Sequence, residues 1–194
     1  FPLSADQGAL TFIGRRAPTD YPRVVDPPAG QVWTANSRQL AGLSYATLGD
    51  GGADLGARAQ QIRDDLSALS TAPGGKVNEA AVYGISLDDR ALFLSTFRDR
   101  ALRTLDAAAL AQDPNRAEFR RLLEQSWDGH ASPQSVGYRL ARSYLYGMYE
   151  IFFGGLDAEL GQLVPGLDFD TASPRWPYVI ARLIDEKPAG WLPA

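Results

Sequence analysis

The distribution of proline and glycine limits the fold of this chain more than any other feature of its sequence. Residues 1–52 contain many of both, which excludes long helices because proline interrupts the hydrogen bonds of a helix. Two stretches, residues 9–14 (ALTFIG) and 31–35 (QVWTA), have the composition of short strands. We expect Val32 and Trp33 to face a core. Strands this short need partners, so we expect them to pair with the rest of a longer parent chain or with a second copy.

From Asp54 onward the apolar residues recur with the period of a helix. The first series steps by three and four residues, which places its members on one face. This face contains Leu55, Ala59, Ile62, Leu66 and Leu69. A short helix is predicted over residues 77–83. Ser86 can cap the next long helix, and Asp89 lies where it would complete a capping box. The inward side chains of that helix are predicted to be Leu87, Ala91, Leu94, Ala101 and Leu105.

Three residues that precede a proline predict further helix starts. Asp113-Pro114 and Ser132-Pro133 each combine a capping side chain with a first-turn proline, and the first predicts a helix over residues 113–127. Ser173-Pro174 is a weaker signal for a last helix through Glu186. The helix after Ser132 carries a predicted apolar stripe and a glycine pair, 154–155, that is expected to kink or split it. The stripe consists of Val136, Leu140, Met148, Phe152, Leu156 and Leu160.

These patterns predict a mainly α chain with a short extended or β segment at its N-terminal side, an α+β arrangement. Residues 1–52 form the extended part and residues 53–194 a helical subdomain. The chain has 194 residues, of which 45% are hydrophobic, enough for one core.

Composition excludes several classes of function. A net charge of −4 argues against a nucleic-acid partner, and no apolar run is long enough to span a membrane. Cysteine is absent and histidine occurs once, as His130, so thiol catalysis and a multi-histidine metal site are excluded. We predict no metal site and no cofactor for this chain.

His130 and the acidic pairs have ordinary structural explanations. The sequence SWDGHAS places Ser126, Asp128 and Ser132 near His130, but Asp128-Gly129 is typical of a helix stop and turn. Adjacent carboxylates on a helix point about 100° apart, so neither the pair 64–65 nor the pair 88–89 forms a catalytic dyad. We expect both acidic pairs to lie on solvated faces of helices.

The glycine-rich sequence LGDGGADLG precedes a helix but lacks the pattern of a phosphate-binding loop. Asp50 and Asp54 would repel a phosphate. We therefore expect a tight turn that ends in an N-cap, supplied by Asp50 or Asp54.

Asn36 has two interpretations. It can end a strand through an Asx-turn, or its neutral amide can donate to an oxyanion that develops during acyl transfer. Arg58, on the following helix, also has two interpretations. It can form surface pairs with its neighbours Asp64 and Asp65, or it can hold a carboxylate or fix a polar neighbour.

Four segments occur in an order that resembles the penicillin acylase (penicillin amidase) family. They are YPRVVDPPAGQVWTANSR, GDGGADLGARAQQIRDDL, SLDDRALFLSTFRDRALRTL and LLEQSWDGHASPQSVGYRLARSYL. The resemblance covers most of residues 20–160. It implies an N-terminal nucleophile hydrolase of αββα fold, in which a serine with a free α-amine attacks an N-acyl amide. By this resemblance Asn36 helps to form the oxyanion hole, and Arg58 supports that asparagine or the substrate.

The resemblance also implies a periplasmic or secreted enzyme, with antibiotic or related N-acyl compounds as substrates and a possible structural calcium in the full-length family. Departures from the pattern are equally clear. Residue 1 is Phe, Ser4 has no free α-amine, Ser37 replaces a second asparagine, and the family's Q-x-D motif has Ser86 in place of its glutamine. We therefore expect a fragment of the β-chain that lacks its nucleophile and is inactive alone.

The alternative is a helical binding or oligomerisation module without catalysis. Its support is a set of aromatic side chains, although we expect most of them to form core. They are Trp127, Tyr138, Tyr144, Tyr146, Tyr149, Phe152 and Phe153.

Overall fold

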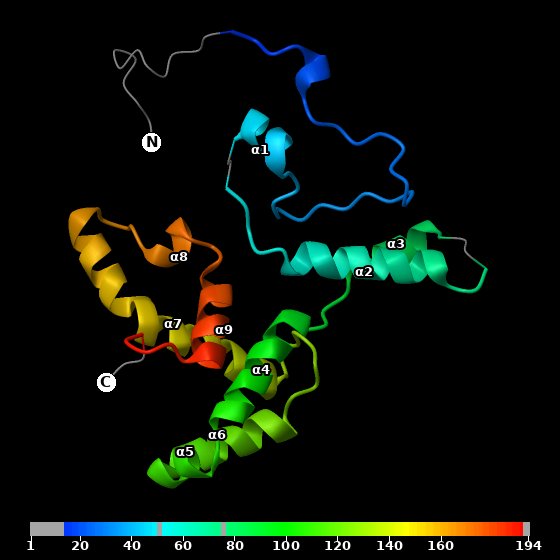
Figure 1. Ribbon diagram of the computed structural model, residues 1–194. Coiled ribbons are helices and arrows are strands. Elements are labelled where there is room, and N and C mark those ends of the chain that lie inside the picture. The colour runs from blue at the N-terminus through cyan, green and yellow to red at the C-terminus, as the bar shows by residue number, and fades with distance from the viewer. Residues whose placement is uncertain (1–13, 50–51, 75–76, 192–194) are drawn as a thin grey trace.

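The computed structural model describes residues 14–49, 52–74 and 77–191. In chain order it contains the short 3-10 helix η2 (Pro18–Asp20) and the helices α1 (Gly42–Leu48), α2 (Ala57–Thr71), α3 (Glu79–Ser86), α4 (Leu92–Thr104), α5 (Ala107–Gln112), α6 (Pro114–Gln125), α7 (Val136–Leu163), α8 (Phe169–Ala172) and α9 (Trp176–Glu186) (Figure 1). Within these ranges strand-type pairing is limited to isolated bridges, Ser37 with Asp54 and Arg90 with His130. The prediction of a mainly α chain is confirmed.

The main core lies where α4 and α9 pack against the long helix α7 (Figure 1). Phe97 of α4 and Ile180 of α9 are almost completely buried there, and Trp176 stacks edge-on against Tyr149 with ring centroids 4.7 Å apart. Most of the aromatic residues are core, as expected: Tyr149 and Phe153 are buried, and Trp127, Tyr138, Tyr144 and Phe152 pack partly buried beside them. Among the described helices none is long and apolar enough to cross a bilayer.

A second cluster joins α4 and α6 to the start of α7. Ala101, Leu123 and Ala141 are fully buried in it. Gly137 lies directly beneath the backbone of Trp127, where an added Cβ would come within 2.6 Å of the Trp127 Cα. Small residues on α7 therefore let α6 and the turn after it approach closely.

The fully buried face of α7 lies one residue away from the predicted stripe, of which Leu140, Met148 and Phe152 pack partly buried against the cores. The buried line is Gly137, Ala141, Leu145, Tyr149 and Phe153. Val136 and Leu156 of the predicted stripe are 48% and 41% exposed. This face is buried because its small residues, Gly137 and Ala141, allow α6 to pack closely. A prediction based on large apolar side chains does not identify such a face. The helix also passes through Gly154-Gly155 without a break, because a glycine in a helix costs only about 1 kcal/mol.

Two predicted helix starts are corrected. Ser86 ends α3 instead of capping the next helix, Leu87 is 65% exposed, and α4 begins only at Leu92. Residues between α3 and α4 are held extended by the turn after α6: the Ala91 amide donates to the Gly129 carbonyl at 2.7 Å. The cap of α7 is Ser135, whose Oγ accepts from the Tyr138 amide, and not Ser132.

Other boundaries follow the sequence signals. Asp113 caps α6 through its carboxylate, which accepts from the Asn115 amide at 2.8 Å, with Pro114 in the first turn as predicted. The predicted face of α2 is its less exposed face, with Ala59 buried. The last helix ends at Glu186 as expected but begins at Trp176.

The predicted strand over residues 31–35 is wrong. This segment runs along α2 in the opposite direction (Figure 1), and its contacts are made with that helix. Gln31 Nε2 donates to the Leu66 carbonyl at 3.0 Å, and Arg58 Nη2 donates to the Ala35 carbonyl at 3.2 Å. Eight residues of helix rise about 12 Å, and four extended residues span about 13 Å, so the two anchor points match.

Val32 is 66% exposed on this segment, so it does not face a core. The described chain offers no sheet that could cover it. The other predicted strand, residues 9–14, lies outside the described residues except for Gly14.

Candidate functional site

Asn36 lies at a sharp bend directly after residues 31–35, the segment that runs alongside α2. Its φ of 57° is in the left-handed region, which asparagine tolerates better than most residues. The Asn36 carbonyl accepts from the Asp54 amide at 2.8 Å, next to the bridge between Ser37 and Asp54. The bend is therefore fixed to the chain that leads into α2.

Arg58 extends from the first turn of α2 toward this bend. Its Nη2 donates to Asn36 Oδ1 at 2.8 Å and to the Ala35 carbonyl at 3.2 Å, and it lies 3.9 Å from the Asp54 carboxylate. The structure thus brings the two predicted site residues into direct contact. Asn36 Oδ1 accepts from Arg58 and not from its own backbone as in an Asx-turn, and Arg58 fixes a polar neighbour.

This contact determines which way the Asn36 amide points. A guanidinium can only donate hydrogen bonds, so the oxygen of the amide must face Arg58 and the nitrogen must face away. Within residues 14–49, 52–74 and 77–191 the Nδ2 of Asn36 has no acceptor. The residue is exposed. The site therefore presents an oriented N–H donor to a molecule from outside.

The glycine-rich turn does not end in an aspartate cap within the described residues. The N-cap of α2 is Gly56, with no side-chain hydrogen bond, and the Asp54 carboxylate accepts a hydrogen bond from the next amide, that of Leu55 at 2.7 Å. Asp50 lies outside the described residues. Asp54 instead ties α2 to the Asn36 bend through its backbone amide.

A second polar cluster joins α2 to the chain between α3 and α4. Arg90 donates to both Asp88 oxygens, at 2.8 and 2.7 Å, and to Asp65 at 2.5 Å, while Gln61 donates to Asp88. The Asp88 side chain is only 13% exposed. Its pKa is well below the ordinary range, mainly because of the hydrogen bond from Arg90, and the same contact raises the pKa of Arg90.

The sequence interpretation missed this cluster, because it assigned the acidic pairs to solvated helix faces. Asp65 and Arg90 are 25 residues apart, and the bend that brings them together has no local signal. The expectation that neither pair forms a dyad holds, since Asp64 binds Arg63 and Asp89 binds His130.

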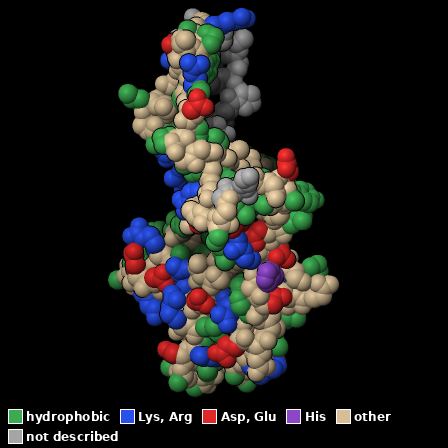
Figure 2. All heavy atoms as spheres, turned by 90° about the vertical axis from the view of Figure 1, so that its right-hand side faces the viewer, with side chains coloured by type: hydrophobic (Ala, Val, Ile, Leu, Met, Phe, Trp, Pro, Cys, Tyr) green, Lys and Arg blue, Asp and Glu red, His purple; other side chains and the backbone are tan. Residues whose placement is uncertain are grey.

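His130 lies on the surface beside acidic side chains (Figure 2). Its Nδ1 is 2.6 Å from Asp89 Oδ1, and this hydrogen bond raises the pKa of the imidazole. No triad forms among the described residues: Ser126 Oγ donates to the Leu122 carbonyl, and Ser132 Oγ donates to Gln134. The pair instead joins the chain before α4 to the turn before α7.

A pocket of about 490 Å³ lies between α2, α4 and α7. Its lining includes Arg58, Ile62, Asp88, Leu92 and Tyr146. No group of three or more metal-ligating side chains occurs in the described parts of the chain. The polar side chains that line this pocket carry guanidinium, amide, carboxylate and hydroxyl groups.

Comparison with known proteins agrees with the resemblance of the sequence motifs. The family model described as Penicillin amidase, a hydrolase family, matches residues 1–194, the whole chain. The chain therefore belongs to the penicillin amidase family. Comparison with curated proteins and with solved structures finds no significant match.

Proposed function

We propose that this chain is the part of an N-terminal nucleophile hydrolase that supplies one donor of the oxyanion hole, and that the enzyme cleaves N-acyl amide bonds. The observation that carries the proposal is the contact between Arg58 and Asn36, which leaves the exposed Asn36 amide nitrogen without a partner among the residues that the structure describes. A neutral amide at such a position stabilises negative charge without a change of its own protonation state.

In the proposed reaction a serine hydroxyl attacks the amide carbonyl carbon, and its proton passes to the free α-amine of the same serine. The C=O electron pair moves onto oxygen, and Asn36 Nδ2 donates a hydrogen bond to it. Collapse of the intermediate expels the amine and leaves an acyl-enzyme, which water hydrolyses to a carboxylic acid. The serine and the strands of the αββα fold belong to the remaining parts of the parent chain.

The proposed substrates are N-acyl amides, such as the side-chain amide of a β-lactam, an N-acyl homoserine lactone or another N-acyl compound. The proposed compartment is the periplasm or the exterior of the cell. Both rest on family membership.

The test is the variant Asn36→Asp in a parent chain that carries the nucleophile. Aspartate tolerates a positive φ and keeps an acceptor for Arg58, but its carboxylate cannot donate to an oxyanion. We expect kcat to fall by about 100- to 1000-fold with the fold unchanged. Asn36→Gly relaxes the backbone and removes the side-chain amide, and it should lower kcat by a similar factor. A wild-type kcat in both variants would contradict the proposal.

The requirement for a nucleophile is tested separately. These 194 residues alone, incubated with a chromogenic phenylacetyl or long-acyl anilide, should release no aniline. Release by the isolated chain, lost on Asn36→Asp, would show that the chain contains its own nucleophile.

A further inference from the structure

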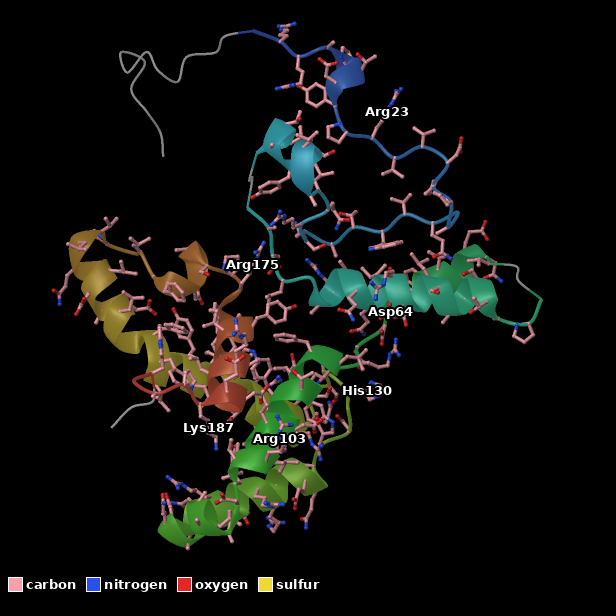
Figure 3. All side chains as sticks on the ribbon, viewed as in Figure 1. Arg23, Asp64, Arg103, His130, Arg175 and Lys187 are labelled. Atoms are coloured by element: carbon pink, nitrogen blue, oxygen red, sulfur yellow. The ribbon has the colours of Figure 1, made fainter. Side chains whose placement is uncertain are left out.

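A second pocket, of about 350 Å³, adjoins the Asn36 bend and is lined by side chains from three separate parts of the chain. Arg38 comes from the loop after Asn36, Arg63 from α2, and Arg175 from the residue before α9. Figure 3 shows Arg175 beside the segment that leads into α2. Three guanidinium groups distant in sequence therefore line one cavity.

The charge around this pocket is opposite to that of the whole chain, which carries −4. Asp54 is the carboxylate of the lining, and it lies 3.9 Å from Arg58, while Arg63 binds Asp64 at 2.7 Å. Together with these two partners, Arg58 and Asp64, the pocket residues contribute four guanidinium groups and two carboxylates. The pocket therefore retains an excess of two positive charges.

Donor groups remain available in it. Within the described parts of the chain the Arg175 guanidinium has no hydrogen-bond or ion-pair partner. Arg38 uses Nε for the Leu40 carbonyl at 3.2 Å and stacks over the Tyr45 ring at 4.1 Å, which holds the guanidinium in place and leaves its terminal nitrogens to other acceptors. Oriented guanidinium groups of this kind bind carboxylates through paired N–H donors.

The same pocket has apolar walls. Trp33 and Tyr178 present aromatic surface, and Leu55 and Ala59 add aliphatic surface. We propose that this pocket binds a small organic acid, whose carboxylate pairs with Arg38 and Arg175 and whose apolar body lies against Trp33 and Tyr178. The site is separate from the Asn36 donor and does not require hydrolysis.

The test is isothermal titration calorimetry of the 194-residue chain with benzoate, with its neutral analogue benzamide and with inorganic phosphate. Benzoate should bind at least about 10-fold more tightly than either of the others. Arg175→Gln and Arg38→Gln should each weaken benzoate binding by about 10-fold, the factor for one charge-assisted hydrogen bond. Arg139→Gln, on an exposed arginine of α7 outside this pocket, should leave it unchanged.

Three results would overturn the proposal. Equal binding of benzamide would show that the carboxylate is not recognised, and equal binding of phosphate would show that the apolar walls play no part. A loss in Arg139→Gln as large as in Arg175→Gln would indicate general attraction of anions. Circular dichroism of each variant separates these results from unfolding.

Discussion

Arg58 Nη2 lies 2.8 Å from Asn36 Oδ1, and the two residues are 22 positions apart in the sequence. The same nitrogen also reaches the Ala35 carbonyl, so one guanidinium fixes both the backbone and the side chain of the bend. Because Arg58 lies in the first turn of α2, the orientation of the Asn36 amide depends on where that helix begins. The helical body thus positions a donor that lies outside it.

Arg58→Lys tests this relationship. A lysine keeps the positive charge but is a single flexible point donor, so it cannot hold Ala35 and Asn36 in the same geometry. In a parent enzyme with its nucleophile we expect kcat to fall by about 10- to 100-fold, the cost of a misplaced catalytic group, with KM little changed. An unchanged kcat with a lower thermal stability would show that Arg58 only supports the fold.

Gly137→Ala is expected to destabilise the chain strongly. The new Cβ would lie 2.6 Å from both the amide nitrogen and the Cα of Trp127, so the backbone of α6 or α7 must move. We expect a loss of about 3 kcal/mol in the free energy of unfolding, measured by urea denaturation. Gly147→Ala is the matched control on the same helix: its Cβ meets nothing within 4 Å, and alanine should stabilise the helix by up to about 1 kcal/mol. Equal effects of the two changes would contradict this packing.

Asp88→Asn removes the charge at the centre of the cluster with Arg90 and Gln61. Because the Asp88 side chain is only 13% exposed, we expect a loss of about 1–3 kcal/mol in stability at neutral pH. Asp64→Asn is the control, since Asp64 is 56% exposed and, in the described part of the chain, pairs only with its neighbour Arg63. A surface pair of this kind contributes about 0–1 kcal/mol.

The pH dependence of this difference has a definite sign. The pKa of folded Asp88 is depressed below its ordinary value of 3.8, mainly by the hydrogen bond from Arg90. Its contribution is therefore complete above pH 3.8 and is lost as the pH falls toward the depressed folded value. Asp88→Asn and the wild type should converge in strong acid, and a gap that stays constant in urea titrations would contradict a role for the charge.

Local signals predicted most helices but not how they contact one another. Asp113-Pro114 determines the start of α6 because the cap and the proline act within one turn. Ser86 carries an equally good local signal and fails, because residues 87–91 pair with the turn that contains Gly129. Tertiary hydrogen bonds from another part of the chain outweigh a cap in this case.

The candidate site, like the fold, could be predicted only in part from the sequence. The order of four motifs suggested Asn36 and Arg58, whereas periodicity alone left each with two interpretations. The orientation of the amide could not be predicted, because it depends on a contact across 22 residues. The cluster of Asp65, Asp88 and Arg90 had no signal for the same reason, since its members come from α2 and from the loop after α3.

His130 provides a further test, because it is the only imidazole of the chain. Its hydrogen bond with Asp89 raises the pKa of the imidazole above its ordinary value of 6.5. A raised folded pKa means that the stabilising contribution is complete below pH 6.5 and is lost as the pH rises through the folded value. We therefore expect the melting temperature to fall as the pH increases across this window, and the fall to be absent in His130→Gln.

The pKa itself is measurable by NMR, since a single histidine gives a single titrating imidazole signal. We expect a wild-type midpoint above 6.5 and a return to about the unperturbed value in Asp89→Asn, because the hydrogen bond and the charge of Asp89 are the largest causes of the shift. Both side chains are about half exposed, so added salt should reduce the shift. A midpoint at or below 6.5, or one that Asp89→Asn leaves unchanged, would show that the pair does not persist in solution. The link between the turn before α7 and the chain before α4 would then rest on its backbone hydrogen bonds alone.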